Sequence, residues 1–293
     1  MRSRWIGSAL VVDAPAKLNL SLSVLGRRPD GYHELETVMV SVGLYDTLVI
    51  EPHDDRLELT CEGESGTLPG DDSNLVMRAA ALLKSTAGVK HGAVMRLIKR
   101  IPMQAGMGGG SSDAAAALVG LNAFWDLRLS SSELHPLAAQ LGSDINFFLD
   151  SPPLAICRGR GEVVEPQPLA CPLWFVIAKP DRGLSTAAVF RQLDLADCGR
   201  ADSRAIVDAA AQGHPGLIAN LLSNDLQRPS RELSPEISDL LDRLQAMSLF
   251  RAQMTGSGSA CFGVAAHREQ ATRAARRLKQ QGVKDVFVAR TAV

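Results

Sequence analysis

A glycine-rich segment between a predicted strand and a predicted helix constrains this chain more than any other feature. Residues 100–121 read "RIPMQAGMGGGSSDAAAALVGL", with four glycines in the five positions from Gly106 to Gly110. The preceding "AVMRLIKRIP" has enough apolar residues to predict a strand that is stopped by Pro102. Residues 111–113, "SSD", favour a helix N-terminus, and "AAAALVGLNAFWDL" continues that helix.

A strand, a glycine loop and a helix N-terminus in this order are typical of phosphate-binding sites. Bare backbone lets N–H groups approach an anion, and the helix dipole favours negative charge at the same place. The segment is neither a P-loop, because no lysine follows the glycines, nor a dinucleotide fingerprint, because Ser111 stands three residues after Gly108. We predict that it binds the phosphates of a nucleotide; a tight structural turn is the alternative.

Composition and charge exclude several classes of protein. The 293 residues are 46% apolar and 22% charged, which is typical of a globular protein with a substantial core. The net charge of −1 implies no general attraction to nucleic acid or to an anionic membrane. The arginines of "HREQATRAARRLKQQ" fit the solvated face of an amphipathic helix. No apolar stretch approaches the length of a bilayer span, so we expect no membrane partner. From the charge we expect no nucleic acid partner, and no feature of the sequence indicates an obligate protein partner.

The five cysteines are scattered, odd in number and without paired spacing, and the histidines do not cluster with them. We therefore expect neither a disulfide framework nor a zinc site, and a reducing, cytoplasmic compartment. The N-terminal "MRSRWIGSALVVDAPA" faintly resembles a signal peptide, but its apolar run is short and cleavage after Ala16 would expose Lys17. We reject that interpretation.

The order of predicted elements favours an α+β fold, because strands and helices are mixed without a regular βαβ repeat. "APAKLNLSLSVLGRRPDGYHELETVMVSVGL" predicts two strands joined by a turn at Pro29-Asp30-Gly31, with "YDTLVIEP" and "RLELTC" as further strands. "SNLVMRAAALLKST", capped by Ser73, and "SSELHPLAAQL" predict helices. The turn-rich "RGRGEVVEPQP" precedes a new strand, "LWFVIAKP", which places a domain boundary near residue 166. The two domains are predicted at 1–166 and 167–293, with a strand pair around "MTGSGSACFGVA" in the second.

Four further signals each have an ordinary structural alternative. Lys17 lies on the polar side of a strand, which is usually a solvent-exposed sheet face. Asp144 could cap the short helix "INFFL". Tyr32 and His33 follow a turn, where exposed aromatic residues are common. "TGSGSAC", from Thr255, could be the tip of a hairpin. They become candidates for a functional site because they occur together in one chain, in this order along the sequence and with the glycine-rich segment.

These segments together resemble the GHMP kinases, a superfamily that includes galactokinase, homoserine kinase, mevalonate kinase and phosphomevalonate kinase. "PMQAGMGGGSSDAA" is similar to the phosphate loop of that superfamily, "PAKLNL" to its first motif and "TGSGSACF" to its third. "AKLNLSLSVLGRRPDGYHELETV", "DSNLVMRAA" and "LGSDINFFL" resemble the branch whose substrate is 4-diphosphocytidyl-2-C-methyl-D-erythritol. The similarity runs nearly end to end and is looser beyond residue 190, apart from the third motif.

The resemblance implies a ribosomal-protein-like N-terminal domain, a ferredoxin-like C-terminal domain and a site in the cleft between them. It also implies an enzyme: ATP phosphorylates the 2-hydroxyl of the methylerythritol unit, in the non-mevalonate route to isoprenoids. Two alternatives are another GHMP kinase of small molecules, such as a homoserine or mevalonate kinase, and an inactive nucleotide-binding regulator. "RPDGYHEL" argues against the first, since those enzymes hold no cytosine. Lys17 and Asp144 argue against the second.

The resemblance also implies roles for individual residues. Asp144 accepts the proton of the hydroxyl, and Lys17 holds Asp144 ionised or stabilises developing negative charge. The residues implied in ATP binding are Asn74, Leu75, Lys99, Pro102, Met103, Gln104, Ala105, Gly106, Met107, Gly108, Gly109, Gly110, Ser111 and Ser112. Those implied in substrate binding are Asn19, Tyr32, His33, Thr186, Phe190, Gly256 and Ser257.

Within this set, Tyr32 and Phe190 are expected to stack on the two faces of the cytosine, and His33 to bind its edge. We expect Mg²⁺ to arrive with ATP, and we assign no protein ligand to it because no cluster of carboxylates marks a metal site. The chain departs from the family pattern at Asn146, where many members carry proline.

Overall fold

The computed structural model describes residues 1–63 and 68–292, which form two compact units. The first unit contains Met1–Ala16, Leu44–Met103 and Gly108–Ser151, and the second contains Lys17–Gly43, Gln104–Met107 and Pro152–Val293. Both units are discontinuous: two long strands, β2 (Ala9–Arg27) and β3 (His33–His53), contribute residues to each of them, and the loop Gln104–Met107 belongs to the second unit although its neighbours in the chain belong to the first.

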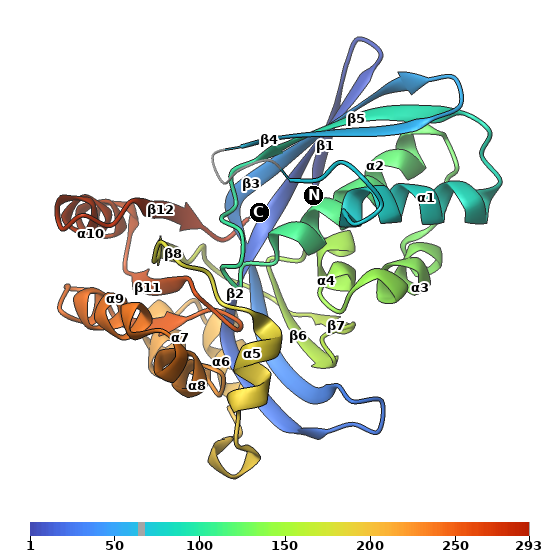
Figure 1. Ribbon diagram of the computed structural model, residues 1–293. Helices are drawn as coiled ribbons and strands as arrows, with labels where there is room; N and C mark the ends of the chain where they lie inside the picture. The colour runs from blue at the N-terminus through green and yellow to red at the C-terminus, as the bar shows by residue number, and fades with distance from the viewer. Residues whose placement is uncertain (64–67, 293) are drawn as a thin grey trace. The chain divides into compact units, whose positions relative to one another are not determined.

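The first unit is a twisted sheet with helices on one face (Figure 1). The sheet has the order β1-β2-β3-β5-β4, in which β1 (Arg2–Ile6) pairs antiparallel with β2, and β4 (Leu57–Gly63) runs parallel to β5 (Gly92–Lys99). Its helices are α1 (Leu75–Ala87), α2 (Gly109–Phe124), α3 (Ser131–Leu141) and α4 (Ile145–Asp150).

Small residues let helix α2 lie close to the sheet. A Cβ atom at Gly120 would lie 2.7 Å from Cδ1 of Ile50 and 3.0 Å from Cγ2 of Val12, so only glycine fits there without a shift of its neighbours. Ala114 to Leu118 are fully buried in the same helix. The alanine-rich sequence of α2 therefore reflects close packing rather than an exposed helix.

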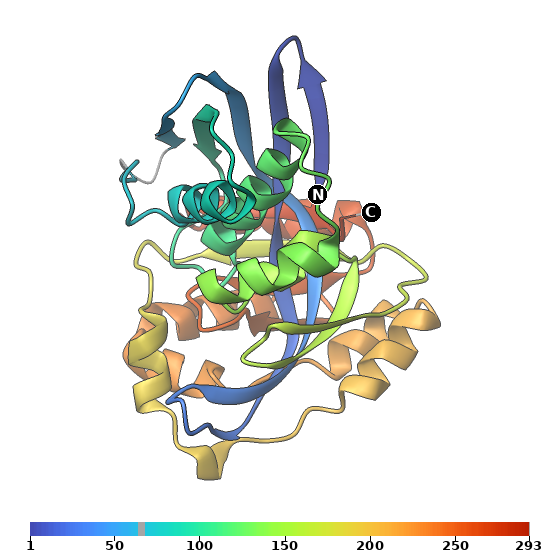
Figure 2. The ribbon, with the colours of Figure 1, turned by 90° about the vertical axis from the view of Figure 1, so that its right-hand side faces the viewer.

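In the second unit, the remaining parts of β2 and β3 form a hairpin. Its turn holds Gly31 at φ 86°, where glycine is favoured, and β3 pairs with β6 (Leu154–Gly159), which pairs with β7 (Val163–Pro166). A two-residue strand, β9 (Ser223–Asn224), runs parallel to β2. Figures 1 and 2 both show the hairpin end beside helix α5 (Thr186–Gln192).

The other sheet of this unit is ferredoxin-like. It consists of β8 (Trp174–Lys179), β10 (Arg251–Met254), β11 (Cys261–Ala265) and β12 (Asp285–Arg290). Every neighbour in the order β10-β11-β8-β12 is antiparallel. Apart from β9, which pairs in the other sheet, the chain order from β8 onward is strand, helices, two strands, helix, strand. This is the arrangement of strands that defines the ferredoxin-like fold.

Helices α9 (Pro235–Gln245) and α10 (Arg268–Gln280) pack against this sheet. Leu240 and Leu244 of α9, Leu278 of α10 and Val176 of β8 belong to one buried cluster. The segment between β8 and α9 holds the rest of the helices: α5, the short 3-10 helix η1 (Leu195–Asp197), α6 (Ser203–Ala211), α7 (Pro215–Asn220) and α8 (Gln227–Leu233).

Most predicted elements are confirmed, and two helix starts are corrected. The N-cap of α1 is Asn74 and not Ser73, because the Asn74 side chain accepts the hydrogen bond from Val76 N. Helix α2 begins at Gly109, two residues before the predicted "SSD", because Gly108 turns the chain in the left-handed region at φ 70°. In the part of the chain that the structure describes, no disulfide joins two cysteines. No helix there combines the length and the apolar character needed to span a membrane.

Candidate active site

The N-terminus of α2 presents backbone N–H groups without help from a capping side chain. Its N-cap residue, Gly108, has no side chain. The first helical hydrogen bond runs from Ser112 N to Gly108 O, at 2.8 Å. The N–H groups of the first three helical residues, 109 to 111, precede that bond, so they have no acceptor within the helix. This geometry suits an anion at the helix start, and the binding of nucleotide phosphates there stays a prediction.

Gly109 and Gly110 are glycines for different reasons. A Cβ atom at Gly109 would lie 3.1 Å from Cγ2 of Ile101 and 3.2 Å from Nζ of Lys99, so a side chain there would press into the unit. At Gly110, the nearest atom to a Cβ would be Cδ1 of Leu75 at 3.7 Å, an ordinary contact. A methyl group at position 109 would therefore force Ile101 or Lys99 to shift slightly, whereas the protein itself has room for a methyl group at position 110.

Asn74 and Leu75 lie where the first unit brings the starts of α1 and α2 together. Asn74 caps α1, and its Nδ2 donates to Pro69 O at 2.9 Å. Leu75 is the first residue of that helix, and it is the nearest neighbour of the Cβ position of Gly110. The half-buried Pro102 and Met103 precede the glycines in this unit.

Lys99 is buried between two carboxylates. Its Nζ donates to Oδ2 of Asp113, at 2.6 Å, and to Oδ2 of Asp46. Burial alone would lower the pKa of Lys99, but Asp113 and Asp46 outweigh it and the pKa is raised, so the ammonium is charged. The resemblance implies Lys99 in ATP binding, and the structure shows that its ammonium binds Asp113 and Asp46 within the first unit.

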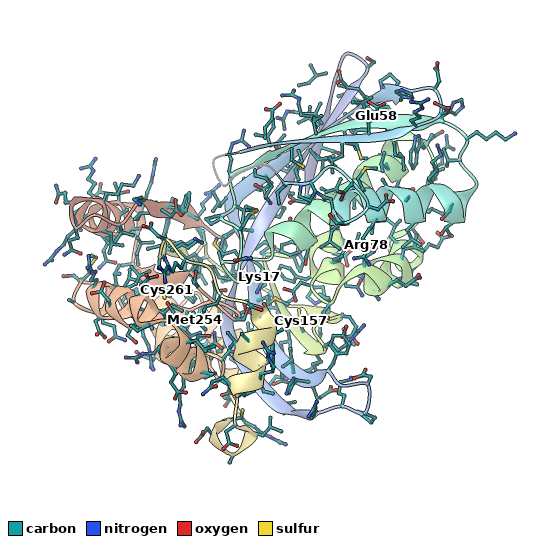
Figure 3. All side chains as sticks on the ribbon, in the orientation of Figure 1. Lys17, Glu58, Arg78, Cys157, Met254 and Cys261 are labelled. Carbon is teal, nitrogen blue, oxygen red and sulfur yellow. The ribbon has the colours of Figure 1, made fainter. Side chains whose placement is uncertain are left out.

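In the second unit, hydrogen bonds join the first motif, the glycine loop and the third motif. Lys17 on β2 (Figure 3) donates from Nζ to Oδ1 of Asn19 at 2.5 Å. The Thr255 hydroxyl accepts from Asn19 N at 3.0 Å and lies 3.1 Å from Asn19 Oδ1 and 3.3 Å from Gly106 O. Lys17 N donates to Met107 O at 3.0 Å. Three segments far apart in the sequence therefore meet around one lysine.

Lys17 and Asn19 are 4% and 2% exposed, so the alternative of a solvent-exposed sheet face is wrong for them. Alternation along a strand predicts which side chains share a face, but not that another segment covers that face. Here the cover comes from residues 104–107 and from the loop 255–260, which joins β10 to β11; Figure 3 labels Met254 and Cys261, the strand residues that flank this loop.

Glycine is required where the two loops touch. A Cβ atom at Gly106, whose φ is 71°, would lie 2.1 Å from Thr255 O. Backbone bonds continue the contact from Ser259 N to Gln104 O and from Ala260 N to Ala105 O, both at 3.2 Å. The predicted hairpin tip at residues 255–260 therefore packs directly against the loop that contains Gly106.

Other predicted substrate residues also pair within the second unit. The hydroxyl groups of Thr186 and Ser257 lie 2.8 Å apart. The backbone O of Gly256 accepts from Nδ2 of Asn224 at 2.9 Å, and a Cβ at Gly256 would lie 3.2 Å from Nζ of Lys17. These contacts bring helix α5, strand β9 and the third motif to the surroundings of Lys17.

Each residue expected to hold cytosine contacts an aromatic or cationic side chain of the second unit. The rings of His33 and Phe190 are stacked, with centroids 4.8 Å apart and planes 22° apart. The guanidinium of Arg160 lies over the Tyr32 ring, 4.7 Å from its centroid. All four residues belong to the second unit, although a boundary at residue 166 would separate Tyr32 from Phe190. Burial, followed by the charge of Arg27, lowers the pKa of His33, so its imidazole is neutral near pH 7.

Asp144 lies in the first unit, just before α4. Its side chain is half-buried and makes no capping hydrogen bond to that helix, so the alternative of a simple helix cap lacks its defining contact. Asn146, the departure from the family pattern, is buried in the first turn of α4.

Sequence reasoning missed four polar residues at these sites: Asp46, Asp113, Arg160 and Asn224. The aspartate of "SSD" was interpreted as a helix-start residue, whereas it is the fifth residue of α2 and is buried. Asn224 carries no local signal, because only the parallel pairing of β9 with β2 brings it to Gly256. Among the described residues, no three His, Cys, Asp or Glu side chains form a cluster that could hold a metal ion.

Comparisons with known proteins agree with the motifs. The family model for the GHMP kinases N terminal domain matches residues 74–151, and the model for the GHMP kinases C terminal domain matches residues 206–284. A 4-diphosphocytidyl-2-C-methyl-D-erythritol kinase of Symbiobacterium thermophilum is 43% identical over 284 residues, covering 96% of this chain and 99% of the relative. The enzyme of that name from Pelotomaculum thermopropionicum is 43% identical over 280 residues, covering 95% and 96%.

Solved structures give the same result for the fold. A crystal structure of 4-(cytidine 5'-diphospho)-2C-methyl-D-erythritol kinase matches with a TM-score of 0.82 and 37% identity, covering 97% of this chain and 100% of that one. A homoserine kinase from Cytophaga hutchinsonii matches with a TM-score of 0.75 but only 18% identity, covering 100% and 97%. The second likeness shows the fold alone.

Proposed function

The chain belongs to the GHMP kinases, in the family of the 4-diphosphocytidyl-2-C-methyl-D-erythritol kinases, and from this we propose its reaction and the roles of its residues. It is an ATP-dependent small-molecule kinase of isoprenoid biosynthesis. It transfers the γ-phosphoryl group of ATP to 4-diphosphocytidyl-2-C-methyl-D-erythritol, and the acceptor is the 2-hydroxyl of the methylerythritol unit, with the 2-phosphate and ADP as products.

One observation carries the assignment of the site. The Lys17–Asn19 pair, Gly106 and Thr255 are joined by buried or partly buried hydrogen bonds, although they come from the three separate motifs. Burying an ammonium group costs free energy unless partners for its charge and its hydrogen bonds are present. Here a buried lysine lies beside the loop that precedes the α2 N-terminus. This supports a role for Lys17 next to the phosphates.

In the proposed mechanism, the N–H groups at the start of α2 bind the ATP phosphates. The helix dipole and these fixed donors oppose the negative charge of the phosphates and of the transferred group. Phosphoryl transfer asks the protein mainly to position reactants and to neutralise charge, so a rigid, glycine-rich loop is suited to it.

We assign the proton transfer to Asp144 and the electrostatic support to Lys17. The carboxylate accepts the proton of the attacking hydroxyl, and the ammonium group keeps that carboxylate ionised or stabilises the charge that develops on the reacting oxygens. Asp144 belongs to the first unit and Lys17 to the second, and their cooperation is part of this proposal.

We assign the cytosine to the aromatic residues of the second unit. Phe190 and Tyr32 offer rings for its faces, and the neutral His33 imidazole can donate to or accept from its edge. Because His33 and Phe190 stack on each other, a base that stacks on Phe190 must displace or share that contact. Asn19, Thr186, Gly256 and Ser257 are the remaining proposed substrate contacts.

We expect Mg²⁺ to be bound by the phosphates of ATP. Among the described residues, no three His, Cys, Asp or Glu side chains form a group that could hold a metal ion, and Mg²⁺ usually keeps water and phosphate ligands and takes few from the protein. When bound, the ion would neutralise charge on the phosphates. A cytoplasmic location and the absence of an obligate protein partner remain predictions from the sequence.

The alternatives are not favoured. Homoserine and mevalonate kinases share the fold at 14–18% identity, whereas relatives at 43% identity carry the cytidyl substrate in their names. ADP release should be measured with a panel of 4-diphosphocytidyl-2-C-methyl-D-erythritol, mevalonate, homoserine and galactose. We expect turnover with the cytidyl compound only. Turnover with another alcohol would replace the proposed substrate, and no turnover with any would support the inactive regulator.

A further inference from the structure

A buried charge network lies beneath the start of helix α2. Asp46 of β3 accepts backbone N–H groups of Arg100 at 2.5 Å and Ile101 at 2.8 Å through Oδ1, and Lys99 Nζ through Oδ2. Asp113 of α2 accepts from the same Nζ. The side chains of Asp46, Lys99 and Asp113 are only 0%, 8% and 4% exposed.

The network connects the phosphate-binding turn to the sheet. Lys99 Nζ would lie 3.2 Å from a Cβ at Gly109, so the ammonium lies directly under the first residue of α2. Asp113 lies four residues further along that helix, which is one turn. The ammonium therefore lies beneath Gly109 at the start of the first turn and bonds to Asp113 at its end, and Asp46 fixes the ammonium to β3.

The charges in this network do not balance when both carboxyl groups are ionised. Asp46 accepts from three donors, whereas Asp113 accepts from Lys99 only, and its other polar neighbour is the carboxyl group of Asp46 itself. The Oδ1 atom of Asp113 has no hydrogen-bond partner among the described residues. An ion pair between Lys99 and one carboxylate would be enough to stabilise the fold. A second buried carboxyl group, with one oxygen that lacks a hydrogen bond, costs free energy of folding. This asymmetry indicates a role beyond packing.

We propose that Asp46, Lys99 and Asp113 are positioning residues for ATP, which hold the first turn of α2 so that its N–H groups bind the phosphates. The proposal rests on the function proposed above. None of the three touches the nucleotide in this proposal: Lys99 acts through the backbone of the turn, and its ammonium contributes positive charge behind the phosphates.

The proton on Asp113 links this network to pH. Burial raises the pKa of Asp113 to about 8, with Lys99 opposing the shift and Asp46 adding to it. The titratable neighbours are Lys99 on β5, Asp46 on β3 and the Cys61 thiol on β4, whose own pKa burial and Asp113 raise. Below about pH 8, the three network residues sum to zero charge. Above it, they carry a net negative charge beneath the phosphates, which weakens ATP binding.

The test is made at Asp113, because removing Lys99 or Asp46 would leave a buried charge without its partner, which is strongly destabilising. Asp113→Ala keeps the Asp46–Lys99 pair but frees the helix turn. We expect its KM for ATP to rise about tenfold at pH 7, while the KM for the cytidyl substrate stays within about twofold. Asp113→Asn keeps an acceptor for Lys99, so its KM for ATP at pH 7 should stay close to that of the wild type.

The pH profile gives a second readout that a purely structural role would not change. The wild-type KM for ATP should rise above about pH 8, and Asp113→Asn should lack that rise because an amide does not ionise. Asp126→Asn, an exposed carboxyl just beyond the other end of α2, is the matched control and should follow the wild type in both assays.

Two results would overturn the proposal: an unchanged KM for ATP in a folded Asp113→Ala variant, or identical pH profiles in the wild type and Asp113→Asn. If Asp113→Ala does not fold, the comparison of the wild type with Asp113→Asn decides alone. Failure of the proposed function looks different, because the wild type itself would then not phosphorylate the cytidyl substrate.

Discussion

The phosphate-binding role of α2 is tested most sharply by Gly110→Ala, since the effects on stability and on ATP should have opposite signs. A Cβ at this position meets only Leu75 Cδ1, at 3.7 Å, so the protein accommodates the methyl group. Replacing glycine by alanine inside a helix stabilises a protein by about 0.4–1 kcal/mol. We therefore expect the Tm to stay unchanged or to rise by about 1–4 °C.

The same methyl group should weaken ATP binding. It would lie beside the N–H groups at the helix start and beside Leu75, where we place the nucleotide. Loss of one hydrogen bond to a charged group costs about 1.5–3 kcal/mol, which is about a tenfold to hundredfold rise in the KM for ATP. The assay is ADP release at saturating cytidyl substrate with varied ATP, together with a thermal melt of the same sample.

Gly120→Ala on the same helix is the control. Its Cβ would lie 2.7 Å from Cδ1 of Ile50 and 3.0 Å from Cγ2 of Val12, so the Tm should fall while the KM for ATP stays near the wild-type value. A Gly110→Ala enzyme that is as stable as expected but binds ATP like the wild type would refute the phosphate site at the start of α2.

Three further predictions follow from the site. Asp144→Asn should lower kcat by about 10²–10⁴-fold with ATP binding nearly intact, and a kcat near the wild-type value would exclude a general base there. Phe190→Ala should raise the Kd of the cytidyl substrate about tenfold to hundredfold and leave that of ATP unchanged, as measured by calorimetry; equal loss for both ligands would contradict a cytosine contact. Since burial raises the pKa of Asp113 from 3.8 to about 8, the folded state holds its proton more tightly than the unfolded state, so wild-type stability should fall relative to Asp113→Asn as the pH rises from about 4 to about 8. Thermal melts over that range check this, and a constant difference in Tm would contradict it.

Local chemistry in the sequence was enough to predict the elements that surround the site. A strand ending before Pro102, glycines and then an alanine-rich run specify a strand, a loop and a helix wherever the segment lies. The turn at Gly31 and the amphipathic helix α10 follow in the same way from residue type and spacing. The three motifs and their order were likewise enough to predict the family.

Tertiary structure alone decided which polar side chains are buried and what they bind. Strand alternation grouped Lys17 with Asn19, but the loop that covers them follows β10, more than 200 residues later, and its Thr255 hydroxyl completes the network. Lys99, Asp46 and Asp113 come from three different elements, so no local pattern could reveal that one ammonium serves two carboxyl groups. The sequence records the preference of each segment for helix, strand or turn, whereas burial and charge pairing depend on contacts between segments, which exist only after the chain has folded.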